Sequence, residues 1–209
     1  MGREIDHIVY CVPDLEEGVN YISNLFGVKP VIGGAHLTKG TKNALLNLGN
    51  KCYLEILAID HDNVDFKGLR WMGIDLIREP KITRWSLKSN TLKSDSKILS
   101  LHSPELGIID SGSRKTMDGL LLSWEMILPA SAPEVELLPF MTDWSESEMH
   151  PTDKLEQGCV FNSIELYHLN PKIVQSMLYD LRVKNIVQSD SEVTIAVNIQ
   201  SPKGMVRLV

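Results

Sequence analysis

Residues 5–12 read IDHIVYCV, a nearly continuous run of apolar and β-branched side chains that stops at Pro13. A run of this kind predicts a buried β-strand, and proline ends it because proline has no backbone N–H to donate. Asp14 follows as a helix N-cap, and Glu17 stands at the position that completes a capping box. The segment therefore predicts a strand that leads directly into a helix.

The residues after Asp14 extend this pair into a β-α-β-β-β unit. Apolar residues recur at helical spacing as far as Phe26, and Gly27 stands where a left-handed C-cap is expected. Three more strands are predicted from β-forming runs separated by glycine-containing turns, over residues 28–32, 44–48 and 52–59. We place this first module at residues 4–60.

The same order of elements recurs later in the chain. In residues 160–209, Asn170 stands 156 positions after Asp14 and opens a second amphipathic helix pattern. A weaker middle copy covers residues 82–144, where the predicted helix is polar and poorly capped. We therefore predict an α+β fold. Repeated β-α-β-β-β modules would form a single domain over residues 1–209, and their curved mixed sheets would enclose a barrel-like cleft.

Composition narrows the classes of partner. The chain has 27 acidic and 21 basic residues, a net charge of −6 and no block of Lys and Arg, which argues against nucleic acid. No apolar run reaches the roughly 18 residues that a membrane span needs. The cysteines, Cys11, Cys52 and Cys159, are odd in number and far apart, which predicts a reducing cytoplasm without disulfides. We expect a cytoplasmic protein whose partner is a small molecule.

His7 and Glu55 are the first candidate site residues. Alternation along its strand puts His7 on one face with Val9 and Cys11, and Glu55 lies inside the apolar run CYLEILAI. An ionised carboxylate in such a run is costly unless it is paired or bound to a cation. If the strands curl into a half-barrel, both side chains point into its concave side and suit a divalent first-row metal. The alternatives are a structural histidine and a solvent-exposed edge-strand glutamate.

The third module offers a comparison for this pair. Ser163 stands at the position that aligns with His7, and Arg207 at the position that aligns with Glu55. If the modules share one scaffold, folding does not require the histidine and the glutamate. The comparison therefore favours a functional role for them.

Several segments of the chain also resemble the sequence motifs of a known protein family. The patterns IDHIVYxVPDL, GVxPxxGGxH, GTxNALLxLG, YLEI and LPFxxDW, with a later HP and GC, resemble the glyoxalase-like domain proteins of the vicinal oxygen chelate superfamily. The resemblance implies paired β-α-β-β-β modules whose sheets close around a metal. It also implies an enzyme of one of the superfamily's classes, which are lyases, isomerases, epimerases and extradiol dioxygenases that bind substrate through two adjacent oxygens. Other members of the superfamily bind drugs without metal or catalysis.

The resemblance implies a second pair of ligands from the middle module. The position that matches His7 falls on Trp85, which cannot ligate a metal, and the position that matches Glu55 falls on Asp143, which can. His150, in the loop just after Asp143, is an alternative second imidazole. The expected metal set is therefore His7 and Glu55 with His150 or Asp143. The expected cofactor is a divalent ion such as Zn, Ni, Mn, Fe or Mg.

Other polar and aromatic residues are candidates for substrate contacts. Thr41 and Asn43 precede a strand and supply a hydroxyl and an amide, although both are also frequent turn formers. His36 can contact the ligand or transfer a proton, since histidine titrates near neutrality. Arg78 is a candidate for binding a carboxylate, and two aromatic residues are candidate stacking walls, Trp85 and Trp144.

These assignments lead to three hypotheses. The first is a metal-dependent lyase or isomerase that acts on a carbonyl-containing metabolite, with Glu55 as ligand or base and His36 as a catalytic group. The second is a metal-free protein of the bleomycin-resistance type that sequesters a small molecule. The third is a degenerate scaffold that acts through protein contacts. A monomer and a homodimer are both compatible with the modules.

Overall fold

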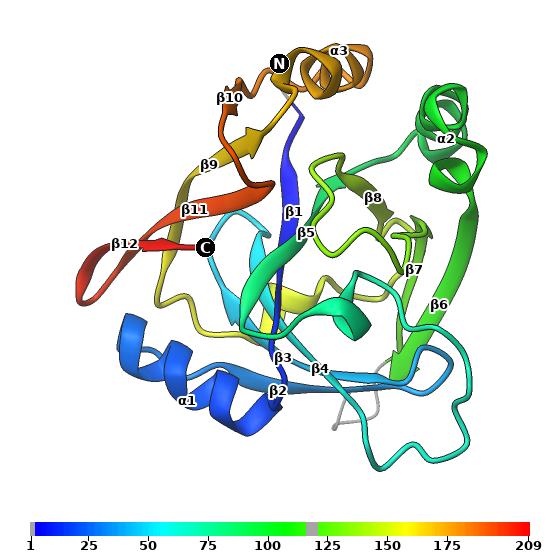
Figure 1. Ribbon diagram of the computed structural model, residues 1–209. Coiled ribbons are helices and arrows are strands. Elements are labelled where there is room, and N and C mark those ends of the chain that lie inside the picture. The colour runs from blue at the N-terminus through cyan, green and yellow to red at the C-terminus, as the bar shows by residue number, and fades with distance from the viewer. Residues whose placement is uncertain (1–2, 116–120) are drawn as a thin grey trace.

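The N-terminal strand occupies the middle of a large, strongly curled β-sheet (Figure 1). The structure is a computed structural model and describes residues 3–115 and 121–209. The elements of the first module are β1 (Ile5–Cys11), α1 (Leu15–Phe26), β2 (Val31–His36), β3 (Thr41–Asn47) and β4 (Tyr53–Ile59). The N-cap at Asp14 and the C-cap at Gly27 are confirmed, because the Asp14 carboxylate accepts a 2.9 Å hydrogen bond from Glu17 N and Gly27 has φ 75°.

The middle module completes the large sheet. A 3₁₀ turn, η1 (Ile74–Leu76), precedes β5 (Lys81–Lys88), α2 (Leu92–His102), the 3₁₀ turn η2 (Pro104–Gly107), β6 (Ile109–Lys115), β7 (Leu121–Ile127) and β8 (Phe140–Asp143). The strand order is β2-β3-β4-β1-β5-β8-β7-β6, with β1 and β5 antiparallel at the centre. Each module runs outward from this central pair in the same relative order. The two edge strands are therefore the matching strands β2 and β6.

The third module has the expected order of elements but a different topology. After the 3₁₀ turn η3 (Pro151–Lys154) come β9 (Val160–His168), α3 (Pro171–Asp180), β10 (Val187–Ser189), β11 (Thr194–Ser201) and β12 (Gly204–Leu208). They form a separate sheet in the order β10-β9-β11-β12. Ser163 and Arg207 both pair with Asn198 on β11, from opposite sides. They are thus not neighbours as His7 and Glu55 are, and the sequence comparison between these pairs joined positions that are not equivalent.

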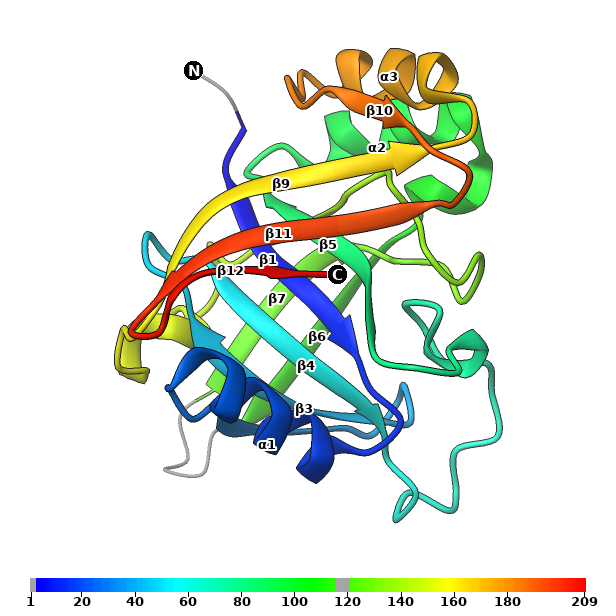
Figure 2. The same cartoon turned by 60° about the vertical axis from the view of Figure 1, so that its left-hand side comes forward.

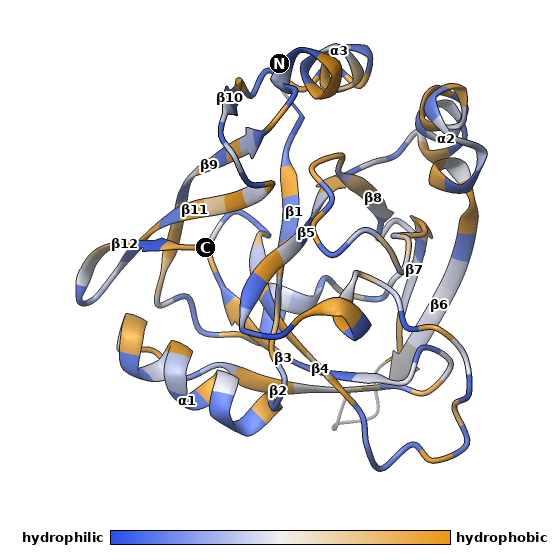
Figure 3. Cartoon of the chain, viewed as in Figure 1, coloured by the Kyte–Doolittle hydropathy of each residue, from blue (hydrophilic) through white to orange (hydrophobic). Residues whose placement is uncertain are grey.

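The convex face of the large sheet carries the main hydrophobic core. Buried residues from that face pack with the apolar stripe of α1 and with the inner face of the small sheet, as Ile8, Phe26 and Leu166 illustrate. The small sheet and α1 lie on the same side of the large sheet (Figure 2), and α1 has distinct apolar and polar stripes (Figure 3). The α+β class is confirmed. In the described part of the chain, no helix has the length and apolar character needed to cross a bilayer.

Trp85 belongs to this convex core and does not face the cleft. It pairs with Ile8 in the register of β5 and β1, it is 0% exposed, and its Nε1 donates to the carbonyl oxygen of Leu137 at 2.8 Å. The residue of β5 that pairs with His7 is Ser86. The fixed offset assumed from the sequence was therefore off by one residue in the middle module. For that reason Trp85 is not placed to stack on a ligand in the cleft.

A substitution at Trp85 should affect stability. In Trp85→Phe the carbonyl of Leu137 loses its buried donor, so we expect the free energy of unfolding to fall by about 1–3 kcal/mol in urea denaturation. Trp124→Phe, at a partly exposed indole, is the matched control and should cost less. Equal losses for the two variants would contradict the assignment of Trp85 to the core.

Candidate active site

His7 and Glu55 meet on the concave face of the large sheet. β1 and β4 are parallel neighbours, and Glu55 pairs with Val9, which lies on the same face as His7. The His7 Nε2 atom is 3.8 Å from the Glu55 Oε2 atom, and neither residue is more than 5% exposed. The His7 ring stacks on Tyr53, with 4.6 Å between the ring centroids. The two side chains thus share one concavity, which is the placement that the strand pattern predicts.

Asp6 holds the other nitrogen of the His7 imidazole. The His7 Nδ1 atom lies 2.6 Å from the Asp6 Oδ1 atom. Strict alternation places Asp6 on the convex face, but the register of β1 against β5 shifts between Ile5 and His7. Such an irregularity re-aims a side chain, so the two adjacent residues can contact each other. With Nδ1 donating to Asp6, Nε2 keeps its lone pair toward Glu55. The sequence analysis did not assign Asp6 to the site. The only sequence feature that could have indicated it is its position directly before His7.

His150 and Trp144 contact Asp6. The Asp6 Oδ2 atom is 3.5 Å from His150 Nε2 and accepts a 3.1 Å hydrogen bond from Trp144 Nε1. The other nitrogen of His150 lies 2.8 Å from the hydroxyl of Thr152 at the start of η3. Burial acts to raise the pKa of Asp6, but hydrogen bonds from His150 and His7 outweigh it and lower the pKa to about 2. His150 therefore supports the Asp6 carboxylate behind His7.

Three polar residues of β2 and β3 form a second set of contacts. Asn43 donates from Nδ2 to the Oε1 atom of Glu55 at 2.6 Å, and the same Nδ2 lies 3.4 Å from His36 Nε2. His36 Nδ1 is 3.0 Å from the hydroxyl of Thr41, which also accepts a 3.1 Å hydrogen bond from Trp71 Nε1. The structure thus brings His36, Thr41 and Asn43 together beside Glu55. Trp71, which holds Thr41, is a site residue that the sequence analysis did not assign.

The middle module contributes hydroxyls at the place where the resemblance implies metal ligands. Ser86 pairs with His7, and its Oγ atom is 2.8 Å from the Oγ1 atom of Thr142 on β8. Asp143 follows Thr142 on the strand and therefore points to the opposite face. Its Oδ1 atom accepts a 2.8 Å hydrogen bond from Ser145 N. The structure does not bring Asp143 to His7 and Glu55.

The arginines lie away from this pair. Arg78 is exposed between η1 and β5, outside the residues that line the cleft. Arg84 is 1% exposed, and burial lowers its pKa to about 10. Its guanidinium donates to backbone carbonyls of the loop before β8, those of Ala130, Pro133 and Glu134, and to that of Thr83. Arg84 therefore anchors a loop.

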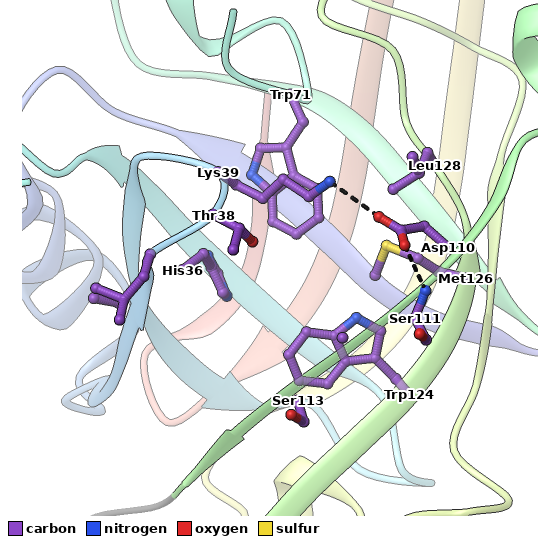
Figure 4. Close-up of a pocket in the computed structure, with 13 residues that line it drawn as sticks. His36, Thr38, Lys39, Trp71, Asp110, Ser111, Ser113, Trp124, Met126 and Leu128 are labelled. Atoms are coloured by element: carbon purple, nitrogen blue, oxygen red, sulfur yellow. Dashed lines mark hydrogen bonds and ion pairs between the residues drawn. The ribbon is translucent and has the colours of Figure 1, made fainter. Parts of the chain in front are cut away.

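Two adjoining cavities lie on the concave face. An inner cavity of ≈ 30 Å³ is lined by His7, Glu55 and Asn43, among others. An outer chamber of ≈ 550 Å³ shares further lining residues with it: His36, Trp71, Trp124 and Met126. In Figure 4 two indoles face this chamber: that of Trp71, from the segment that connects the first two modules, and that of Trp124, from the middle module. The catalytic candidates therefore lie at the floor of a cleft that can hold a small molecule.

A family model described as a glyoxalase-like domain matches residues 5–181. The chain belongs to this glyoxalase-like domain family. The resemblance in the sequence motifs is thereby confirmed. No curated protein shows significant sequence similarity to this glyoxalase-like protein.

One solved structure shares its fold and two others are less similar to it, all at low sequence identity. A hypothetical protein from Staphylococcus aureus is 16% identical, with a TM-score of 0.66, and the match covers 99% of this chain and 98% of that one. A methylmalonyl-CoA epimerase from Mycobacterium tuberculosis is 18% identical, with a TM-score of 0.42 and coverage of 67% and 87%. One from Streptomyces coelicolor is 13% identical, with a TM-score of 0.45 and coverage of 71% and 99%. The match to the Staphylococcus aureus protein shows the fold alone.

The side chains of the glyoxalase-like protein allow a test of the metal that its family resemblance implies. Within residues 3–115 and 121–209, no group of three or more His, Cys, Asp and Glu side chains is arranged to hold a metal ion. His7 Nε2 and Glu55 Oε2 are suitable donors, and a cation with bonds of about 2 Å can reach both across 3.8 Å. The donors therefore fit a cation held by two protein ligands, but they do not provide four.

Gly33 should control the position of Asn43. A Cβ atom at Gly33 would overlap the Oδ1 atom of Asn43, so the amide that holds Glu55 would have to move. We expect Gly33→Ala to lower the free energy of unfolding by about 1–3 kcal/mol in urea denaturation. In an Asn43→Ala background most of this cost should disappear, because the colliding atom is gone. Full additivity of the two changes would refute the proposed overlap.

The lowered pKa of Asp6 predicts a pH-dependent contribution to stability. A carboxylate with a lowered pKa stabilises the fold above its ordinary pKa of 3.8 and loses this contribution as the pH falls toward 2. Asp6→Asn should therefore be less stable than the parent protein at pH 7 by about 2 kcal/mol, and the difference should shrink between pH 5 and pH 2. Urea denaturation at several pH values measures it. Asp62→Asn, at an exposed carboxylate, is the control, and a difference that stays constant with pH would contradict the prediction.

Proposed function

We propose that this glyoxalase-like protein is a vicinal oxygen chelate enzyme that moves a proton on a carbonyl-containing metabolite, as an isomerase or a lyase. The observation that carries the proposal is the buried pair of His7 Nε2 and Glu55 Oε2, 3.8 Å apart at the floor of the cleft. A buried imidazole and carboxylate that converge on one cavity are typical of acid–base or cation-assisted chemistry.

The side chains around the pair have separable roles. Glu55 is the base that takes a proton from the carbon next to the substrate carbonyl, and Asn43 keeps its carboxylate in place through the 2.6 Å hydrogen bond to Oε1. His7 presents Nε2 to the same space because Asp6 binds Nδ1. His36, at the boundary between the inner cavity and the outer chamber, donates a proton of its own imidazole to a neighbouring substrate atom, and proton exchange with solvent then restores Glu55 and His36. The inner cavity of ≈ 30 Å³ leaves little room for water beside the reacting atoms.

A divalent cation fits the same arrangement. His7 and Glu55 would hold it, and its remaining positions would be open to two adjacent substrate oxygens. When bound, such a cation supplies Lewis-acid stabilisation of the negative charge that develops as the proton leaves. Glu55 can then serve as ligand, as base, or as both in turn.

The proposal is tested by proton exchange and by metal content. Protein purified without chelator should contain a divalent metal in near-stoichiometric amount by inductively coupled plasma mass spectrometry. In deuterium oxide it should exchange the Cα proton of an accepted 2-hydroxy carbonyl compound, followed by NMR across a panel of such compounds. Glu55→Gln should slow the exchange by about 10²–10⁴-fold, the range for loss of a general base. His7→Ala should lower both metal content and thermal stability.

His61→Ala, at an exposed histidine in the loop after β4, is the matched control and should behave like the parent protein. Metal far below stoichiometry, together with no loss of stability in His7→Ala, would refute the metal-dependent enzyme.

A second candidate function is metal-free sequestration of a small molecule. The outer chamber favours it, because at ≈ 550 Å³ it is large enough for a ligand and its walls include the indoles of Trp71 and Trp124. Metal-free protein that gains thermal stability with a ligand but catalyses no exchange would support this function. The degenerate scaffold hypothesis expects a cleft filled by its own side chains and therefore no stabilisation by any ligand.

A further inference from the structure

The outer chamber limits what the rest of the substrate can be. It shares four lining residues with the inner cavity, so a substrate whose carbonyl reaches Glu55 must extend into it. Its walls are mainly aromatic and aliphatic, with Trp71 on one side and Trp124, Met126 and Leu128 on the other (Figure 4). Such walls favour a flat apolar group, since aromatic faces stack on one another.

The position of the Trp124 indole is set by a close approach to β6. Gly112 pairs with Trp124 across β6 and β7, and a Cβ atom at Gly112 would lie 2.6 Å from two carbons of the indole. The glycine thus lets the ring lie directly against the backbone of the edge strand. This arrangement presents the indole to the chamber and leaves the space between the two modules open.

One charged pair spans the same chamber. Lys39, in the turn between β2 and β3, lies 3.3 Å from the carboxylate of Asp110 on β6, and its ammonium is 5.5 Å from the centre of the Trp71 ring. Lys39 is the one lysine or arginine among the described residues that line the chamber. Both partners of this ion pair are partly exposed, and pairs of this kind contribute little to stability. A carboxylate on a ligand can therefore replace Asp110 as the partner of Lys39.

From these contacts we propose the substrate class, an inference that rests on the proposed function: the substrate is an aryl-substituted carbonyl compound that carries a carboxylate. The aromatic ring lies against Trp124, and the carboxylate binds Lys39, whose ammonium lies over the Trp71 ring. Lys39 is thus the residue that determines specificity for the anion, and Asp110 competes with the ligand for it.

The inference is tested with three small molecules that lack a reacting carbonyl and so report on the outer chamber alone. 3-Phenylpropanoate has the ring and the carboxylate, 3-phenylpropanamide has the ring without charge, and propanoate has the charge without the ring. Isothermal titration calorimetry should give a Kd for 3-phenylpropanoate about tenfold lower than for the amide, as expected for one charge-assisted hydrogen bond. Its Kd should also be at least about tenfold lower than that of propanoate, which keeps the charge but buries no ring.

Variants identify the residue responsible. Lys39→Met keeps the aliphatic stem and should abolish the preference for 3-phenylpropanoate over the amide. Asp110→Asn releases Lys39 and should tighten 3-phenylpropanoate severalfold. Lys42→Met is the matched control, because Lys42 lies on β3, pairs with Asp60 and Asp62, and does not line the chamber. It should leave all three affinities unchanged.

Two results would overturn the inference: equal affinity for 3-phenylpropanoate and propanoate, or an unchanged preference in Lys39→Met. Its failure is distinguishable from failure of the proposed enzyme. Selective binding of 3-phenylpropanoate without any proton exchange would refute the enzyme and support the chamber assignment. Exchange activity on substrates whose affinity does not depend on a ring or a charge would support the enzyme and refute the chamber assignment.

Discussion

The central pairing of β1 with β4 on one side and β5 on the other is the constraint on which the rest of the structure depends. It places the edge strands β2 and β6 at the two ends of a curled sheet, so that the concave face becomes a cleft. The irregular register at Asp6 brings a carboxylate to the His7 ring on that concave face. In a regular strand the side chains of adjacent residues would point to opposite faces. Asp6 stays ionised because its hydrogen bonds to His7 and His150 outweigh the effect of burial on its pKa.

The two modules of the large sheet share their strand order but contribute different residues to the site. The first supplies the buried polar residues, His7, Glu55 and Asn43, whereas the equivalent region of the second supplies a bonded pair of hydroxyls, Ser86 and Thr142. The second module instead contributes one wall of the outer chamber through Trp124. The third module does not line the inner cavity or the outer chamber, and its sheet buries the convex face, on which Trp85 lies.

Sequence patterns predicted the local parts of the fold well. The cap at Asp14, the turn at Gly27 and three strands of the first module depend on neighbouring residues and on side-chain periodicity, and the structure confirms them. The second strand was predicted at residues 28–32, but β2 runs from Val31 to His36. The shared concavity of His7 and Glu55 also follows from alternation once the strands are adjacent. The register of the middle module could not be predicted from the sequence. A shift of one residue still gives an apolar pattern that fits a buried strand, but it moves Trp85 from one face of the sheet to the other.

The sequence by itself determined the α+β class, the β-α-β-β-β order of the modules and the residue types available in the first strand and the fourth. These properties are set by hydrophobic periodicity and capping, which are local. Only the tertiary structure decided which strands are neighbours, and therefore that Ser163 and Arg207 lie apart while Asp6 contacts His7. Strand pairing and bulges depend on contacts between residues distant in the chain, and no local pattern encodes those distances.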